Sequence, residues 1–316
     1  MPNPIDATLL IQAARSGDSR SLARLISAVE SGGAVATEIV SALYRDIGHA
    51  WTVGITGAPG SGKSSLVNHL ITHIRRGGAK VAVVAVDPSS PFTGGAILGD
   101  RIRMQQHIDD DGVFIRSMAS RGQLGGLGAS SSRVVMILDA FGFDEVIVET
   151  VGVGQAEVDI AANVDTTVVV VNPGWGDAVQ TAKAGLLEIG DVFVVNKADR
   201  PGVDETIRDL NAMLDLDVDS FWRPLVVQCT AHTGDGTEAV WDAVTQHREH
   251  LDGGGKIPAR RDRWRTEFRR AVKHRYSERA QRLLNSSAAT AVGDAVADLE
   301  KDPWTAAAEL TWDLDR

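Results

Sequence analysis

Cysteine is almost absent from this sequence, and so are long apolar runs. The single cysteine among 316 residues, Cys229, excludes an internal disulfide framework and suits a reducing compartment. No apolar run approaches the roughly 18 residues that a membrane-spanning helix requires. Residues Met1 to Asp6 lack the basic and apolar character of a leader. We therefore expect a cytoplasmic protein without a membrane partner.

Basic residues are also in deficit. The chain has 32 Lys and Arg against 42 Asp and Glu, which gives a net charge of −10. This balance argues against nucleic acid as the main partner. The eight histidines show no metal-ligand spacing. With 43% hydrophobic and 23% charged residues, the composition is that of an ordinary globular protein.

One segment matches a phosphate-binding motif at every position. Residues Gly57 to Ser64 read GAPGSGKS, which fits G-x-x-x-x-G-K-[ST]. A short apolar strand is expected over 51–56 and an amphipathic helix over 65–74, as this motif requires. The sequence therefore predicts a P-loop that binds a nucleotide.

The residue types explain the chemistry. Glycines let backbone N–H groups point inward around a phosphate, and the following helix adds its N-terminal partial charge. Lys63 can reach the β- and γ-phosphates, and the Ser64 hydroxyl can bind Mg²⁺. The expected phosphate contacts are Gly57, Ala58, Pro59, Gly60, Ser61, Gly62, Lys63, Ser64 and Ser65.

The rest of the chain is organised around this loop. Residues 1–50 predict a cap of three helices, the third over Val35–Ile47, and residues 51–250 predict an α/β nucleotide-binding domain. The further strand candidates are Val81–Val86, Val113–Ser117, Glu145–Glu149, Thr166–Asn172, Val192–Asn196 and Leu225–Cys229. Such β-branched runs, alternating with helices, indicate a mostly parallel sheet whose ligands lie at the carboxyl ends of the strands.

Acidic residues follow two of these strands. Asp87 and Asp100 come after Val81–Val86, a strand we expect to lie beside the one that carries the P-loop. They are either ligands of a nucleotide-bound Mg²⁺ or a turn residue and a helix cap. Glu149 ends another buried strand, where a carboxylate orients a water on Mg²⁺ or the attacking water.

The residues after Glu149 extend the same expectation. Gly152 could sense the γ-phosphate through its backbone N–H. Gln155 could orient the nucleophile, although it is equally suited to begin a helix. The glycine-rich segment 116–128 is either a nucleotide-dependent switch or a flexible connection.

The base is predicted to be guanine. Asn196, Lys197 and Asp199 form N-K-x-D directly after a strand. A carboxylate at Asp199 can accept from N1–H and the 2-amino group of guanine, whereas adenine offers neither donor. The loop after the last strand, with Thr230, Ala231 and His232, suits the backbone contact to guanine O6.

The C-terminal segment 251–316 predicts a helical extension. Leu251 to Lys256 contains three consecutive glycines and is predicted to be a linker. Residues 256–279 carry ten Lys and Arg against three Asp and Glu, with large apolar residues at helical spacing. This helix either packs on a partner, such as a second copy of the chain, or is solvated with one buried stripe.

Several motifs together resemble the MeaB/ArgK family of G-protein chaperones. They are GAPGSGKSS at 57–65, VDPSSPFTGGAILGDRIRM at 86–104, QLGGLG at 123–128, VETVGVGQ at 148–155, PGWGDAVQ at 173–180, NKAD at 196–199 and DPWTAA at 302–307. The similarity extends over nearly the whole chain. The segments around Asp87 and Glu149 are more specific to this family than the P-loop alone.

The resemblance implies a GTPase of the signal-recognition-particle and nitrogenase-iron-protein type that hydrolyses GTP slowly. It implies a homodimer formed through the C-terminal helices, and an adenosylcobalamin-dependent acyl-CoA mutase, such as methylmalonyl-CoA mutase, as partner. GTP would gate cofactor loading and protect or reactivate the mutase.

By position, the resemblance assigns phosphate and Mg²⁺ contacts to Lys63 and Ser64, and the acidic Mg²⁺ and water shell to Asp87, Asp100 and Glu149. It assigns base reading to Asn196, Lys197 and Asp199, and a further switch to residues 172–183, which contain Trp175 and Val179. Arg121 could supply charge at the transition state.

Two other functions remain open at this point. A GTPase that inserts nickel would need a His-rich or Cys/His cluster, and this chain has one cysteine and scattered histidines. A kinase for a binding protein of a transport system would need an acceptor pocket.

Overall fold

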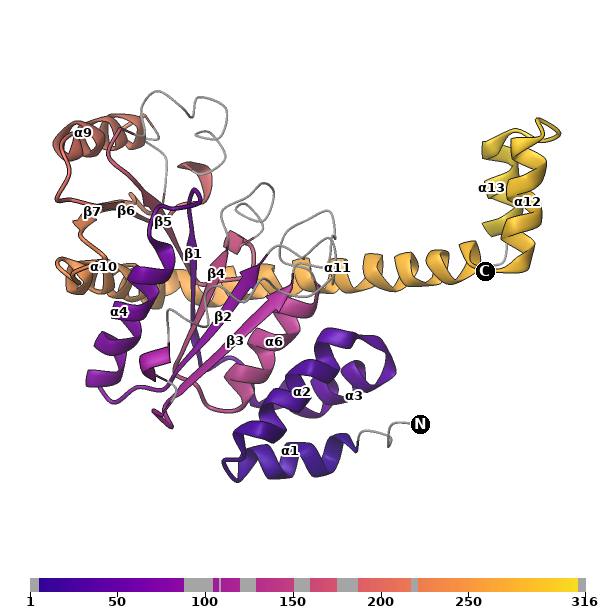
Figure 1. Ribbon diagram of the computed structural model, residues 1–316, viewed down its shortest axis with the longest axis horizontal. Coiled ribbons are helices and arrows are strands. Elements are labelled where there is room, and N and C mark those ends of the chain that lie inside the picture. The colour runs from indigo at the N-terminus through magenta and orange to yellow at the C-terminus, as the bar shows by residue number, and fades with distance from the viewer. Residues whose placement is uncertain are drawn as a thin grey trace. The chain divides into compact units, whose positions relative to one another are not determined.

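Figure 1 shows a computed structural model of the chain. The structure describes residues 6–87, 105–107, 109–119, 129–150, 160–174, 187–216 and 221–311. The chain divides into two compact units, Met1–Arg260 and Arg261–Arg316.

A seven-stranded sheet forms the centre of the first unit. The strands are β1 (Trp51–Thr56), β2 (Val81–Asp87), β3 (Val113–Ala119), β4 (Glu145–Thr150), β5 (Thr166–Val171), β6 (Val192–Asn196) and β7 (Leu225–Cys229). Their order is β3-β2-β4-β1-β5-β6-β7, and every neighbouring pair is parallel. All seven strands that the sequence predicts are therefore present, and the α/β prediction is confirmed.

The strand order corrects one expectation. β2 does not lie beside β1, because β4 pairs with both strands and separates them. Glu149 on β4 is opposite Ile55 on β1 and Ala85 on β2. The periodicity of a strand indicates that it is buried but carries no information about its neighbours, so the sequence could not reveal this insertion.

Helices cover both faces of the sheet (Figure 1). On one face α4 (Lys63–Arg76) and α10 (Thr237–His250) pack on alternate residues such as Val81 and Val83. On the other face α6 (Ala129–Ala140) packs on Ala82 and Val84. α9 (Val203–Leu214) forms a third cluster with β5 and β6. A short 3₁₀ helix, η2 (Gln105–His107), precedes β3.

The N-terminal helices α1 (Ala7–Arg15), α2 (Ser19–Ser31) and α3 (Gly33–Leu43) join the core on the α6 side. The predicted third helix was too long, because α3 ends at Leu43 and a 3₁₀ turn, η1 (Tyr44–Asp46), follows. The Asp139 carboxylate of α6 then accepts hydrogen bonds from the backbone N–H groups of residues 48–50. These bonds turn the chain into β1 and replace a further helical turn.

The predicted linker is helical, which is a third correction. A π-helical turn, η3 (Leu251–Gly255), joins α10 to α11 (Lys256–Leu284) without a break. Glycine costs about 1 kcal/mol relative to alanine in a helix. Both flanks of the turn are fixed, however, since α10 is packed on the sheet and Arg260 hydrogen-bonds to the loop before β1.

The second unit contains most of α11 together with α12 (Ser287–Ala297) and α13 (Pro303–Thr311). α12 and α13 lie side by side (Figure 1) and bury Ala289 and Ala306. Ser286 caps the first of these helices and Asp302 caps the second, each by accepting backbone N–H groups.

Candidate nucleotide site

The P-loop lies between β1 and α4, as the sequence predicts. Three of its glycines have positive φ: Gly57 at 136°, Gly60 at 73° and Gly62 at 98°. A Cβ on Gly57 would lie 2.1 Å from the carbonyl oxygen of Val170 on β5. Glycine is therefore required here by both the backbone conformation and the close approach of the neighbouring strand.

Lys63, the first residue of α4, is 6% exposed. Its Nζ donates hydrogen bonds to the carbonyl oxygens of Gly57 at 2.6 Å and Ala58 at 3.1 Å. The side chain therefore folds back along the loop, and its ammonium group lies where the loop closes. This places a positive charge next to the N-terminus of α4, a combination that favours a phosphate.

Ser64 and Glu149 meet on the α4 side of the sheet. Ser64 Oγ donates a hydrogen bond of 2.6 Å to Glu149 Oε1, and both residues are buried. A hydroxyl and a carboxylate in contact offer the hard oxygen ligands that Mg²⁺ prefers. The two residues thus fit a Mg²⁺ site beside the P-loop, which is what the sequence predicts for them.

Some predicted residues are not part of the described structure. Asp87 ends β2, but its side chain lies outside the described part. Asp100, Gly152, Gln155, Arg121, Trp175 and Val179 also lie outside the described residues. Their roles remain predictions.

Asn196, the last residue of β6, joins the N-K-x-D segment to the P-loop. It is 2% exposed, and its Nδ2 donates to the carbonyl oxygen of Ser61 at 2.6 Å. Its Oδ1 accepts from the backbone N–H of Ala231 at 2.9 Å. A Cβ on Gly62 would lie 2.1 Å from Asn196 Nδ2. Glycine at position 62 therefore both adopts the positive φ and leaves room for this asparagine.

Lys197 makes a parallel connection. It adopts a left-handed backbone conformation with φ at 59°, which is uncommon for a residue with a side chain. Its Nζ donates to the carbonyl oxygen of Gly60 at 2.8 Å. Two consecutive residues of N-K-x-D thus donate side-chain hydrogen bonds to carbonyl oxygens of the P-loop.

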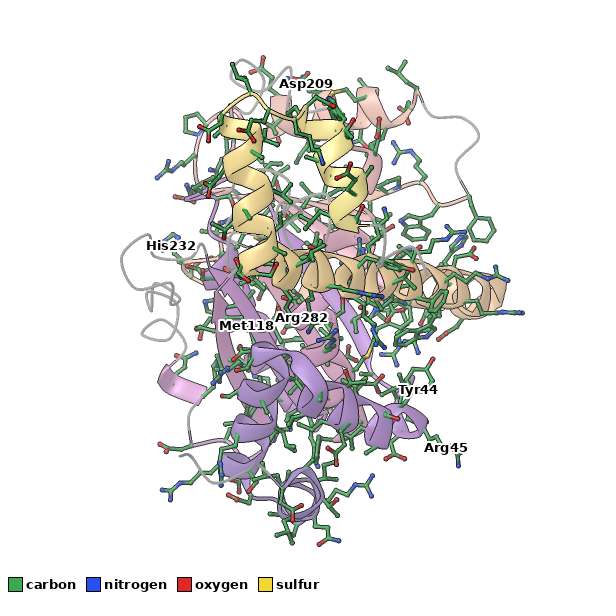
Figure 2. The ribbon with its side chains drawn as sticks, turned by 90° about the vertical axis from the view of Figure 1, so that its right-hand side faces the viewer. Tyr44, Arg45, Met118, Asp209, His232 and Arg282 are labelled. Atoms are coloured by element: carbon green, nitrogen blue, oxygen red, sulfur yellow. The ribbon has the colours of Figure 1, made fainter. Side chains whose placement is uncertain are left out.

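A cavity of about 390 Å³ opens between these loops. Its lining residues are Gly62, Ser65, Asn196, Lys197, Asp199, Arg200, Ala231 and His232. Asp199 is exposed, so its carboxylate can accept hydrogen bonds from a ligand, and His232 lies at the surface (Figure 2). The structure therefore brings the P-loop and the predicted guanine readers to one cavity.

Arg200 and Thr150 were not predicted as part of the site. Arg200 lines the cavity, and its position directly after N-K-x-D was the available signal. Thr150 Oγ1 donates to Thr56 Oγ1 at 3.1 Å and ties the end of β4 to the residue before the P-loop. Thr230 was predicted to contact the base, but its backbone N–H donates to the Asp235 carbonyl oxygen at 2.8 Å. It is absent from the residues found to line the cavity.

Within the described ranges, no group of three or more His, Cys, Asp or Glu side chains is arranged to hold a metal ion. No helix in the same ranges is long and apolar enough to cross a membrane.

The family model of methylmalonyl-CoA mutase-associated GTPase MeaB matches residues 22–285. The chain belongs to the MeaB family. Like its family, it is a GTPase that hydrolyses GTP to GDP and phosphate. The family membership that the sequence motifs predict is thereby confirmed.

Individual relatives are similar in sequence to this chain over most of their length. A protein of Pyrococcus abyssi is 47% identical over 303 residues, which is 94% of each chain. GTPase ArgK of Escherichia coli is 35% identical over 281 residues, covering 84% of this chain and 83% of ArgK. The crystal structure of an LAO/AO transport system kinase superposes with a TM-score of 0.71 at 26% identity and covers 100% of both chains. The P-loop GTPase fold is therefore shared with a solved structure.

Proposed function

We propose that this protein is a Mg²⁺-dependent GTPase that acts as a chaperone for an adenosylcobalamin-dependent acyl-CoA mutase, methylmalonyl-CoA mutase being the first candidate. GTP binding and hydrolysis would gate loading of the mutase cofactor and protect or reactivate the enzyme. The description of the family as mutase-associated supports the choice of partner. A cytoplasmic location is part of the proposal.

The observation that carries the nucleotide part is the shared cavity. The amide of Asn196 contacts the P-loop on one side, while Asp199 lies in the same cavity lining with an exposed carboxylate. A guanine there can donate N1–H and its 2-amino group to that carboxylate, whereas adenine would leave it without a donor. A site built on such hydrogen bonds discriminates strongly between the two purines.

Residues at the P-loop carry out the hydrolysis step in this proposal. Lys63 exchanges its carbonyl partners for the β- and γ-phosphate oxygens of GTP and neutralises charge there. Ser64, Glu149, Asp87 and Asp100 are the proposed holders of Mg²⁺, which when bound contributes further charge neutralisation at the phosphates. Glu149 orients the attacking water through its buried carboxylate. Because no strong general base is evident among these residues, intrinsic turnover is expected to be slow.

Glu149→Gln tests this assignment, because it keeps the shape of the side chain and removes its charge. We expect GTP hydrolysis to fall by about 100-fold or more while GTP binding persists. Glu145→Gln is the matched control, since it makes the same change at the opposite end of β4. Equal hydrolysis by both variants would contradict the role of Glu149.

The nucleotide and the fate of its phosphate are tested with labelled GTP and ATP. We expect phosphate to be released to water from GTP and ATP to bind far more weakly. The alternative function is a kinase, as one solved relative is described. Label retained on a protein would support phosphoryl transfer to an acceptor.

The partner is tested with the mutase of the same organism. The full-length chain should co-elute with methylmalonyl-CoA mutase, and GTP should change the rate at which adenosylcobalamin enters the apo-mutase. The Glu149→Gln variant should still bind the mutase, but the complex should no longer dissociate after GTP is added, because hydrolysis is blocked. Failure of the wild-type chain to co-elute with any cobalamin-dependent mutase would refute the chaperone role.

A homodimer formed through residues 251–316 is also part of the proposal. Phe268, Val272 and Tyr276 recur every fourth residue on α11 and are 69%, 39% and 59% exposed in the single chain. Such a stripe is typical of a helix that packs on a partner. Phe268→Asp combined with Tyr276→Asp should give a monomer in light scattering, whereas Arg265→Ala, on the same helix, should not.

A further inference from the structure

Cys229 is the last residue of β7 and lies opposite Asn196 of β6 in the parallel register. It is 1% exposed, and its Sγ is 3.4 Å from Asn196 Oδ1, within hydrogen-bond distance for sulfur. Burial raises the pKa of the thiol to about 12, so it remains protonated at neutral pH. An S–H group in this position is a donor toward the amide oxygen of Asn196.

The partners of Asn196 fix which way its amide faces. Its oxygen accepts from the thiol of Cys229 and the backbone N–H of Ala231, while its nitrogen donates to the carbonyl oxygen of Ser61. A rotation of the amide by 180° would place NH₂ against two donors and oxygen against a carbonyl oxygen. In the observed orientation, Ser61 takes one of the two N–H groups of Nδ2, and the second can be donated to an acceptor on a purine.

We propose that Cys229 is a positioning residue for guanine recognition, acting through the amide of Asn196. This inference rests on the proposed role of Asn196 as a base reader. The competing explanation is packing alone, because Cys229 also belongs to the apolar cluster between the sheet, α4 and α10. The two explanations differ in what a hydrogen-bonding replacement should do.

The test compares Cys229→Ala, which removes the donor, with Cys229→Ser, which keeps one. Calorimetry on the full chain with Mg²⁺ measures the dissociation constants for GTP and for inorganic tripolyphosphate. We expect Cys229→Ala to weaken GTP binding about three- to tenfold, the loss typical of one hydrogen bond. Tripolyphosphate, which has no base, should change by less than about twofold, and Cys229→Ser should bind GTP within about twofold of the wild type.

Two further readouts separate positioning from packing. The kcat at saturating GTP should stay unchanged in Cys229→Ala while KM rises, because Lys63 and Glu149 are intact. Val227→Ala removes apolar volume from the same strand away from Asn196 and should lower only the melting temperature. Wild-type GTP affinity in Cys229→Ala, or equal weakening of GTP and tripolyphosphate, would overturn the inference. So would a Cys229→Ser variant that binds GTP as weakly as Cys229→Ala.

Asp199→Asn separates this inference from the proposed function. If the wild type does not prefer GTP to ATP, or Asp199→Asn leaves that preference intact, the guanine site itself is wrong. If Asp199→Asn abolishes the preference while Cys229→Ala binds GTP like the wild type, only the role of Cys229 is refuted.

Discussion

Replacement of Arg260 by alanine should destabilise the first unit more than any surface substitution on α11. The Arg260 guanidinium donates to both carboxylate oxygens of Asp165 at 3.0 Å and to the carbonyl oxygens of Gly48 and Ala50. It also lies 5.8 Å from the ring centre of Trp51. These contacts attach the beginning of α11 to the amino-terminal ends of β1 and β5.

The magnitude follows from the burial of the pair. The Asp165 side chain is 3% exposed and that of Arg260 is 16% exposed, so removal of the arginine takes a two-pronged cationic partner away from a buried carboxylate. Such a loss typically costs about 3–5 kcal/mol. Asp165 keeps hydrogen bonds from the backbone and the hydroxyl of Thr52, which favours the lower end of that range. At roughly 2–4 °C per kcal/mol, the melting temperature should fall by about 6–12 °C.

Calorimetric melting of the full chain without nucleotide measures this effect. Arg265→Ala is the control, because its pair with Asp262 is exposed on both sides and should be worth less than about 1 kcal/mol. Adding Asp165→Asn to Arg260→Ala should restore part of the loss, since the buried negative charge is removed. An Arg260→Ala variant with the same melting temperature as Arg265→Ala would refute the importance of this ion pair. So would a double variant whose loss of stability equals the sum of the losses from Arg260→Ala and Asp165→Asn.

Other substitutions test single features. Gly57→Ala should abolish GTP binding in calorimetry, because its Cβ would strike the Val170 carbonyl oxygen. Gly253→Ala has open space in a helical turn and should raise the melting temperature slightly. Burial raises the pKa of Glu145 to about 7 despite its pair with Arg248. The folded state therefore binds this proton more tightly, and stability should fall by about 3 kcal/mol as pH rises from 4.5 to 7. Glu145→Gln should remove this fall in denaturant titrations at several pH values, and an unchanged profile would contradict it.

The strands and the phosphate loop could be predicted from the sequence because their signals are local. A β-branched run such as Thr166–Val171 indicates burial on both faces wherever it occurs, and the P-loop motif fixes its own backbone. The N-K-x-D motif could be found after its strand for the same reason. Its connection to the P-loop through Asn196 and Ser61 could not be predicted, because that hydrogen bond joins residues 135 positions apart.

The wrong predictions concern features that distant residues decide. The glycines before Lys256 indicate a flexible segment by composition, yet the packing of α10 and the bonds of Arg260 keep that segment helical. The insertion of β4 between β1 and β2 likewise depends on how the later chain returns to the sheet. Local propensity is overridden where tertiary contacts contribute more free energy than the glycines cost.

The central place of β1 has a consequence for synthesis of the protein on the ribosome. Trp51 pairs with Glu145 and Val53 with Thr166, so the strand that carries the P-loop acquires its two neighbours only after most of the first unit has been made. Parallel pairing at this separation closes long loops and is slow. A nascent chain that ends before β5 therefore exposes one edge of β1 and lacks a complete nucleotide site. GTP can stabilise the fold only late in translation, and earlier arrest products are expected to be prone to aggregation.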